Sequence, residues 1–276
     1  MRLDRVAEDI YIFVSELYAQ VTATVLVAPD GAIVVDTMPF PSETREILSF
    51  IEGRLGAGSV RYVINTHHHG DHVYGNYLFE GAEVIAHDRC REMLARLGPD
   101  GLARAKRDTP ALAEVELRLP DITFQNQMHI GLGYWHLRVF HTPGNTPDGA
   151  SVFVENDRVL IAGDALMPVP HIVGGNCQEL AQTLSRLKSL RPSHIVQGHG
   201  PILLRGEVDE TIDKSVSYLS TIVDRVREVV RRGDPPEELR GIDIETCGMS
   251  RIPLDGLVAR LHLNNLVALY EAFSQS

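Results

Sequence analysis

The sequence has 276 residues, of which 44% are hydrophobic and 23% charged, a balance typical of a folded globular protein rather than a disordered or fibrous one. Its 37 acidic and 26 basic side chains give a formal net charge of -11 at pH 7, which would repel a polyanion, so we expect no nucleic-acid partner. No stretch approaches the roughly 18 consecutive apolar residues of a membrane helix, so we expect no membrane association either.

The first part of the chain alternates strand-like and helix-like segments. Strands are expected where β-branched and apolar residues run between turn residues, and helices where apolar residues recur every three or four positions. In chain order we expect strands at 6–14, 21–27 and 32–35, a helix from its N-cap Ser42 to about Leu55, strands at 62–64 and 83–86, and a helix at 88–97. Residues 98–121 are charged and contain three prolines, so we expect a surface excursion or short helices that border a site.

The second part begins with the same alternation and ends in helices. In chain order we expect strands at 122–124, 128–130, 135–140, 151–154 and 159–162, a helix at 180–190, a strand at 194–196, and helices at 208–232 and 255–273. The similar order of elements in the two parts predicts two sheets packed together with helices outside them, in one α/β domain over 1–205. We expect residues 206–276 to form a helical C-terminal extension that packs on this domain or on a second subunit, so a homodimer formed through it is one option.

Four histidines lie within six positions directly after the strand at 62–64, in the segment Thr66-His67-His68-His69-Gly70-Asp71-His72. His67 and His69 are two residues apart, so in an extended segment they point the same way. Asp71 and His72, on a turn that begins at Gly70, can point to a second position. One short loop could therefore supply ligands to two neighbouring metal ions. Imidazole and carboxylate ligands together suit Zn²⁺, and also Fe or Mn.

Other strands end in the same way. The strand at 159–162 is followed by Gly163 and Asp164, and the strand at 194–196 leads through Gly198 to His199. The strand at 135–140 leads into the loop 141–146. Since active sites of layered α/β folds lie where loops converge beyond strand ends, these side chains are expected to share one site for a small-molecule substrate.

Taken together, these motifs resemble those of the metallo-β-lactamase superfamily, whose pattern is H-x-H-x-D-H followed by a His, an Asp and a His. The resemblance covers about residues 60–200 and rests on the segment 67–72, with Gly163-Asp164 and Gly198-His199-Gly200 in order behind it. It implies an α/β fold, a four-layer αβ/βα sandwich of two mixed β-sheets flanked by helices, with metals at one edge of the sheets.

The resemblance also implies a role for each matching residue. His67 and His69 correspond to the first metal site, Asp71, His72 and His199 correspond to the second, and Asp164 bridges the two sites. The cofactor expected from this ligand set is Zn²⁺, one or two ions per chain, with Fe or Mn as alternatives.

One position departs from the family's usual T-P-G-H-T, because this chain has Asn145 in Thr142-Pro143-Gly144-Asn145-Thr146. An amide oxygen is a neutral and weaker ligand for Zn²⁺ than an imidazole, so full occupancy of the first site depends on this residue. His141 could substitute only if the loop is remodelled. His171 either lines the pocket or is a loop histidine with ordinary hydrogen bonds.

The resemblance implies a metal-dependent hydrolase in which a metal-bound hydroxide attacks the carbonyl of a thioester, ester, lactone or β-lactam. Asp71 would be the catalytic residue, which orients the nucleophile and accepts its proton as well as binding metal. The Thr-His-His-His-x-Asp-His form and the helical extension resemble the glyoxalase II and lactonase branches more than the secreted β-lactamases.

Two alternatives remain open at this point. The first is an iron-dependent oxidative enzyme of the same fold, although the dioxygenase relatives use the histidine that is Asn145 here and no flavodoxin-like domain follows residue 200. The second is a non-catalytic metal-binding relative with a degraded first site, acting as a sensor or scaffold. Hydrolysis by the zinc-loaded protein would separate the hydrolase from the non-catalytic relative.

The number and spacing of the cysteines indicate the cellular compartment. Cys90, Cys177 and Cys247 are odd in number and far apart, which predicts free thiols in a reducing compartment rather than a disulfide framework. The first residues also lack the apolar stretch of a secretory signal. A cytoplasmic protein is therefore expected.

Overall fold

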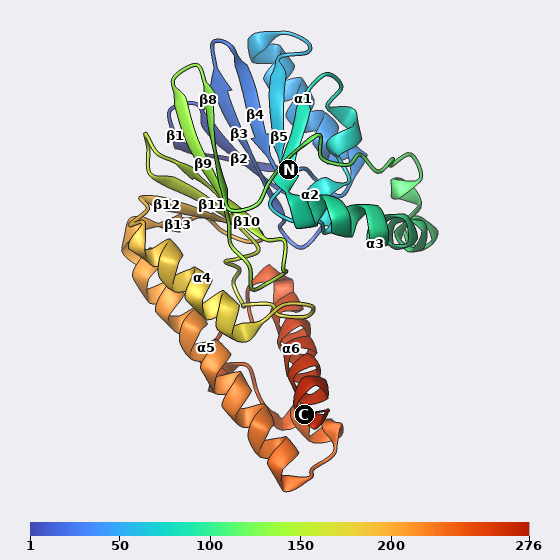
Figure 1. Cartoon of the computed structure of the whole chain (residues 1–276), viewed down its shortest axis with the longest axis vertical. Coiled ribbons are helices and arrows are strands. Elements are labelled where there is room, and N and C mark those ends of the chain that lie inside the picture. Colours follow the sequence, from blue (N-terminus) through green and yellow to red (C-terminus); the bar gives the residue numbers. More distant parts are fainter. Residues whose placement is uncertain (276) are drawn as a thin grey trace.

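The computed structural model describes residues 1–275, and its first seven strands form one sheet in sequence order (Figure 1). The strands are β1 (Arg2–Ala7), β2 (Ile10–Val14), β3 (Thr22–Ala28), β4 (Gly31–Val35), β5 (Val60–Ile64), β6 (Glu83–His87) and β7 (Ile122–Phe124). Pairing is antiparallel from β1 to β4 and parallel from β4 to β7. The carboxyl ends of β4, β5, β6 and β7 therefore lie at the same edge of the sheet.

The remaining strands form a second sheet of order β13-β12-β11-β10-β9-β8. Its strands are β8 (Gln127–Leu132), β9 (Trp135–His141), β10 (Ala150–Val154), β11 (Val159–Gly163), β12 (His194–Gln197) and β13 (Leu203–Leu204). Only the pair β11 and β12 is parallel among these described strands. Both sheets are thus mixed, as expected.

The two sheets pack face to face through one apolar cluster. Ile33 and Val35 of β4 join Val139 of β9, Val152 of β10 and Ile161 of β11 in this cluster, and all five side chains are buried. Burying apolar surface between the sheets is the main force that holds them together. The sandwich brings strand ends from both sheets to a common edge.

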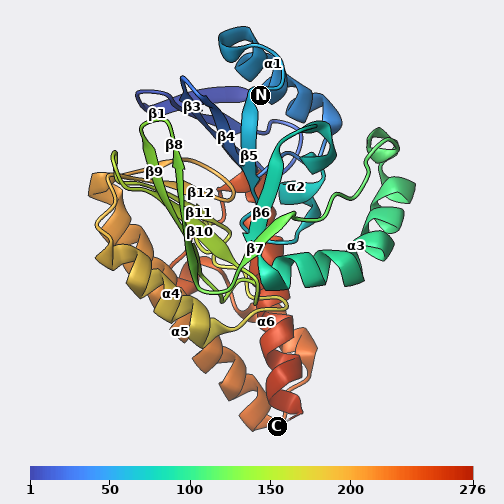
Figure 2. The ribbon, with the colours of Figure 1, turned by 45° about the horizontal axis from the view of Figure 1, so that its top comes forward.

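Helices cover the outer faces of both sheets (Figure 2). On the side of the first sheet lie α1 (Pro41–Leu55), the short α2 (Gly70–Val73) and α3 (Asp88–Asp108), and on the side of the second lie α4 (Cys177–Ser189), α5 (Arg205–Arg232) and α6 (Leu257–Ser274). Short 3₁₀ helices connect them: η1 (Asn76–Leu78), η2 (Pro110–Leu112), η3 (Pro236–Gly241), η4 (Glu245–Cys247) and η5 (Leu254–Gly256). The four-layer αβ/βα arrangement is therefore confirmed.

The C-terminal helices share an apolar cluster with the sandwich. Leu184 of α4, Ile195 of β12, Ile222 of α5 and Leu266 of α6 are all fully buried in it. Beyond this cluster α5 and α6 extend away from the sheets (Figure 1). No helix within residues 1–275 is both long and apolar enough to cross a membrane.

Two expectations near the N-terminus are wrong. The strand expected at 6–14 is two strands, because the chain turns at Asp9, whose φ is 60°. Ser42 does not cap α1, since the N-cap is Phe40 and Pro41 occupies the first turn. Proline suits that place, because its missing N–H has no partner within the helix there and its fixed φ is already helical.

A third correction concerns the helix expected at 88–97. The helix α3 continues through Pro99 to Asp108, so the excursion expected at 98–121 begins with about three more helical turns. Proline within a helix removes one backbone hydrogen bond and crowds the carbonyl four residues earlier. Pro99 itself is exposed, and the contacts of Leu94 and Leu102, both buried, stabilise the helix on either side of it.

Replacing Pro99 by alanine tests this description of α3. The Pro99→Ala protein should unfold at a higher temperature, with a gain of about 1–3 kcal/mol, because the N–H is restored within a helix that already exists. Pro110→Ala is the control, since Pro110 is exposed and opens the 3₁₀ helix η2, where proline is tolerated. Thermal unfolding followed by circular dichroism measures both. Equal effects of the two substitutions would contradict a continuous α3.

Candidate metal centre

Side chains that follow four strands meet at one edge of the sandwich. Asp36 follows β4, the segment 65–73 follows β5, Asp164 follows β11 and His199 lies two residues beyond β12. Backbone contacts join the two sheets there. The Ala150 amide donates to the Thr66 carbonyl at 2.7 Å, and Val21 next to β3 pairs with His199. The ends of both sheets therefore contribute to a single site.

Asp164 lies at the centre of this site. Its Oδ2 is 3.5 Å from Nε2 of His67, and its Oδ1 is 3.4 Å from Nε2 of His72 and 3.6 Å from Nε2 of His199. The carboxylate is only 7% exposed. One oxygen therefore faces His67 and the other faces the remaining two imidazoles, which is the geometry a bridging ligand requires.

Asp71 completes a second group of ligand atoms. Its Oδ2 is 3.3 Å from Nε2 of His199 and 3.9 Å from Nε2 of His72. Within the described residues, two groups of potential ligand atoms each lie within 4.8 Å of one another: His67, His72 and Asp164, and Asp71, His72 and His199. The two groups share His72.

The unpaired atoms of these groups fit a metal ion. Nε2 of His67, Nε2 of His72 and Oδ1 of Asp164 are all buried and form no hydrogen bond with any described residue. Buried polar atoms are almost always paired, so three orphans facing one point indicate a missing partner of positive charge. Nitrogen and oxygen ligands in this arrangement suit Zn²⁺, and also Fe or Mn.

Hydrogen bonds on the far side of each imidazole orient the ligand nitrogen inward. Nδ1 of His72 lies 2.9 Å from Oδ2 of Asp36, and Nδ1 of His199 lies 2.9 Å from the Ala19 carbonyl oxygen. Since both partners only accept, each Nδ1 is the donor and each Nε2 is left to bind a cation.

Thr66 extends this arrangement to His67. The Thr66 hydroxyl donates to Oδ2 of Asp36 at 2.7 Å and lies 3.0 Å from Nδ1 of His67, which leaves that ring nitrogen as the donor. The Thr66 amide also donates to Oδ1 of Asp36 at 2.7 Å. The single carboxylate of Asp36 therefore fixes both the loop backbone and two of the inward-facing imidazoles.

The charges of the site are strongly coupled. Burial raises the pKa of the Asp71 carboxyl, but the positive charge of His72 and His199 outweighs burial and holds that pKa below its usual range. The pKa of Asp164 is lowered well below its usual value against burial, chiefly by His199 and His72. Both carboxylates are therefore ionised at neutral pH and available as ligands.

The pKa values of His72 and His69 are shifted in opposite directions. Burial lowers the pKa of His72, but three neighbouring carboxylates outweigh it and raise that pKa well above its usual value. A proton on His72 and a metal ion are therefore competing sources of positive charge. In contrast, burial and the neighbouring His67 lower the pKa of His69 to about 3, so His69 is neutral at physiological pH.

Of the four clustered histidines, His68 and His69 lie outside both groups of convergent ligand atoms. The His69 ring packs 4.5 Å from the ring of His67, but neither group of convergent ligand atoms contains His69. His68 is paired with the buried Asp148 instead, which accepts from the His68 amide at 2.9 Å and lies 3.0 Å from its Nδ1. Asp148 therefore shapes the loop that carries His67 and His69.

Asn145 is buried near the same loops. Its Nδ2 donates to the His171 carbonyl at 2.9 Å, and its Oδ1 has no hydrogen-bond partner among the described residues. His171 lies close enough for the charges of Asp164 and Asp71 to act on its pKa, although burial dominates and lowers it. Asn145 thus keeps one free acceptor oxygen in a buried position, as a weak ligand would.

His141 is placed elsewhere. Its Nε2 donates to the Pro147 carbonyl at 3.0 Å, and its ring stacks on His87 with a centroid distance of 4.1 Å. Neither convergent group contains it. The loop is not remodelled in a way that would let His141 replace the absent histidine.

Two glycines allow the close approach of the strand ends. Gly163 has φ of 53°, and a Cβ there would come within 2.6 Å of the Thr66 side chain. A Cβ on Gly198 would lie 2.0 Å from Oδ1 of Asp164. Any larger residue at either position would displace a side chain of the site.

Sequence reasoning missed Asp36, Thr66 and the Ala19 carbonyl. A signal for Asp36 was present, because it follows a buried strand directly, as Asp164 does. Tyr18 and Tyr74 were missed as well. The charge of Asp71 and burial raise the pKa of Tyr18, and burial and Asp71 raise the pKa of Tyr74. Both phenols therefore lie near enough to Asp71 for its charge to act on them.

Comparison with known proteins agrees with this geometry. A model of the metallo-beta-lactamase superfamily matches residues 18–199. The beta-lactamase-like protein 2 homolog of Caenorhabditis elegans is 25% identical over 214 residues, 77% of this chain and 65% of that protein. The hydroxyacylglutathione hydrolase of Methylococcus capsulatus is 26% identical over 175 residues, 62% of this chain and 60% of that enzyme. The matches thus span less than two thirds of either relative.

A solved structure shows the same fold. A metallo-beta-lactamase family protein from Thermus thermophilus superposes with a TM-score of 0.72 at 19% identity, covering 98% of this chain and 94% of that one. The family model spans well over half of this chain and includes every ligand candidate from His67 to His199. The chain therefore belongs to the metallo-beta-lactamase superfamily.

Proposed function

We propose that this protein is a metal-dependent hydrolase that cleaves a small-molecule carbonyl substrate, with Zn²⁺ as its metal and Fe or Mn as alternatives. The observation that carries the proposal is the position of Asp164 between three imidazoles, with Oδ1 of Asp164 and Nε2 of His67 and His72 buried and unpaired. Membership of a metallohydrolase superfamily supports the same reaction class.

The metal ions and the side chains of this protein would each supply part of the chemistry. Divalent ions bound at such a site lower the pKa of water and polarise the bond to be cleaved. His67, His72, His199 and Asp164 would hold the ions, with His69 added to the first site. Asp71 is the most exposed carboxylate of the group at 18%, and it is ionised. It is therefore placed to orient a water molecule and to accept a proton from it.

Among carbonyl substrates a thioester is the best supported. The similarity to a hydroxyacylglutathione hydrolase supports thioester cleavage, and esters and lactones share its acyl chemistry. Tyr18 and Tyr74 lie near enough to Asp71 for its charge to act on them, so their phenol groups would be available to a substrate there. Tyr18 is 47% exposed, so its ring is accessible from solvent.

A binding protein without catalysis is the second candidate, because Asn145 stands where the family usually has a histidine. Its free Oδ1 supports a first site that binds metal less tightly than the second. This candidate and the hydrolase differ in one respect that can be measured directly, which is turnover by the fully metal-loaded protein.

Replacing Asp71 by asparagine tests the catalytic role. Asp71→Asn keeps the side-chain shape but removes the charge and the proton acceptor, so turnover of a model acyl thioester should fall about 100- to 10,000-fold. Steady-state hydrolysis of the metal-loaded protein measures this. Asp100→Asn, an exposed change within α3, should leave the rate unchanged. A full rate from Asp71→Asn would contradict the assignment.

Replacing Asp36 by asparagine tests the outer hydrogen bonds. Without the carboxylate, His72 and Thr66 lose their common acceptor, so zinc affinity should fall about 10- to 100-fold. Competition with a chromophoric chelator measures the affinity. The control is Asp121→Asn, because Asp121 accepts from the Val84 amide at the opposite edge of the same sheet. Equal losses from both variants would show that the effect is one of general stability.

Restoring the usual histidine tests the first site. Asn145→His should increase the amount of metal that survives gel filtration, because an imidazole binds Zn²⁺ more tightly than an amide oxygen does. Elemental analysis of protein purified without chelator or added metal gives the ions per chain. If Asn145→His and the wild type retained equal amounts, Asn145 would not limit occupancy of this site.

A further inference from the structure

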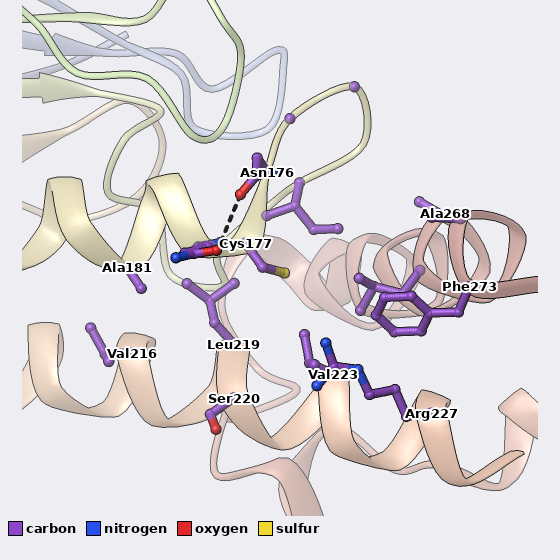
Figure 3. Close-up of a pocket in the computed structure, with 16 residues that line it drawn as sticks. Asn176, Cys177, Ala181, Val216, Leu219, Ser220, Val223, Arg227, Ala268 and Phe273 are labelled. Carbon is purple, nitrogen blue, oxygen red and sulfur yellow. Dashed lines mark hydrogen bonds between the residues drawn. The ribbon is translucent and has the colours of Figure 1, made fainter. Parts of the chain in front are cut away.

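A cavity of about 510 Å³ lies between α4, α5 and α6, beside the loop 172–176 that leads into α4 (Figure 3). Its volume falls within the range of small-molecule sites, about 300–1,000 Å³. Apolar side chains make up most of its wall, with Leu219 and Val223 from α5 and Ala268 and Phe273 from α6. The cavity is thus large enough and apolar enough to bind a hydrocarbon chain.

The lining of the cavity is positively charged, whereas the chain as a whole is negatively charged. Arg227 is the only charged side chain among its described lining residues, which include no Asp or Glu. Its guanidinium lies 5.1 Å from the ring centroid of Phe273 and forms no ion pair with any residue the structure describes. Burial raises the pKa of the Cys177 thiol to about 11, so this group is uncharged at neutral pH. Arg227 is exposed, so the lining carries one positive charge that is accessible from solvent.

The cavity is separate from the metal centre but shares a loop with it. None of the candidate ligands lines the cavity, whereas Ile172, Gly175 and Asn176 do. The Asn176 amide donates to the Gly144 carbonyl at 2.7 Å, directly before Asn145. From α6, Asn265 accepts from the Ile172 amide at 2.9 Å and so fixes the other end of this loop.

We propose that this cavity is a second binding site, for an amphipathic monoanion such as an aliphatic carboxylate. The hydrocarbon chain would lie against Leu219, Val223 and Ala268, where its burial supplies most of the affinity. The carboxylate would pair with Arg227, whose planar guanidinium can donate two parallel hydrogen bonds. The inference goes beyond the proposed function and does not depend on it.

Calorimetric titration of the metal-loaded, full-length protein with decanoate tests the proposal. One decanoate should bind per chain. Arg227→Gln should weaken decanoate binding about tenfold or more, and should change decanol binding little, because decanol lacks the charge. Arg225→Gln is the matched control, a change of the same kind on the same helix but outside the cavity. Equal losses from Arg227→Gln and Arg225→Gln would overturn the proposal.

A substitution that fills the cavity, together with hydrogen exchange that locates the bound ligand, tests the proposal independently. Ala181→Trp places an indole in the cavity and should abolish binding of both decanoate and decanol while the metal content stays unchanged. Hydrogen exchange should show protection by decanoate in residues 172–181, 216–227 and 268–273. Protection confined to residues 66–72 would mean that the carboxylate binds at the metal centre. That result, or a dimer whose contact excludes decanoate from the cavity, would overturn the proposal.

Discussion

The metal centre depends on how the buried charge of Asp164 is compensated. A carboxylate removed from water requires a partner of opposite charge or several donors, and here three imidazoles surround it within 3.6 Å. Asp36, Thr66 and the Ala19 carbonyl occupy the outer nitrogens of those rings. The inner nitrogens of His67 and His72 form no hydrogen bond with any described residue, and that of His199 faces Asp71 and Asp164. The network is balanced only when a positive charge lies at its centre, which is the physical basis of the metal assignment.

The sandwich makes this concentration of ligands possible. Parallel pairing of β4 with β5 and of β11 with β12 places their carboxyl ends at one edge, where both sheets meet. Because Gly163 and Gly198 have no Cβ, the Thr66 side chain can pack against Gly163 and the Asp164 carboxylate against Gly198. The polar contacts between the loops therefore depend on the apolar contact between the sheets. A shift of either sheet would separate Asp164 from His67.

Much of this could be predicted from local patterns. The strands, the outer helices and the six ligand candidates each leave a short signal, either an apolar run or a polar side chain directly after one. Asp36 left the same local signal as Asp164, but its bonds to Thr66 and His72 arise only when β4 and β5 pair side by side. The continuation of α3 through Pro99 was missed because packing of Leu94 and Leu102 overrides a local preference. The cavity depends on the angles between three helices, which no local pattern reports.

The most direct test of the account is anomalous diffraction from zinc-loaded crystals of the full chain. We expect a strong peak within coordination distance of Asp71, His72, Asp164 and His199, and a second peak of lower occupancy beside His67, His69 and Asp164. The lower occupancy follows from the amide at Asn145. A zinc peak elsewhere on the molecule, with none between Asp164 and the imidazoles, would contradict the account.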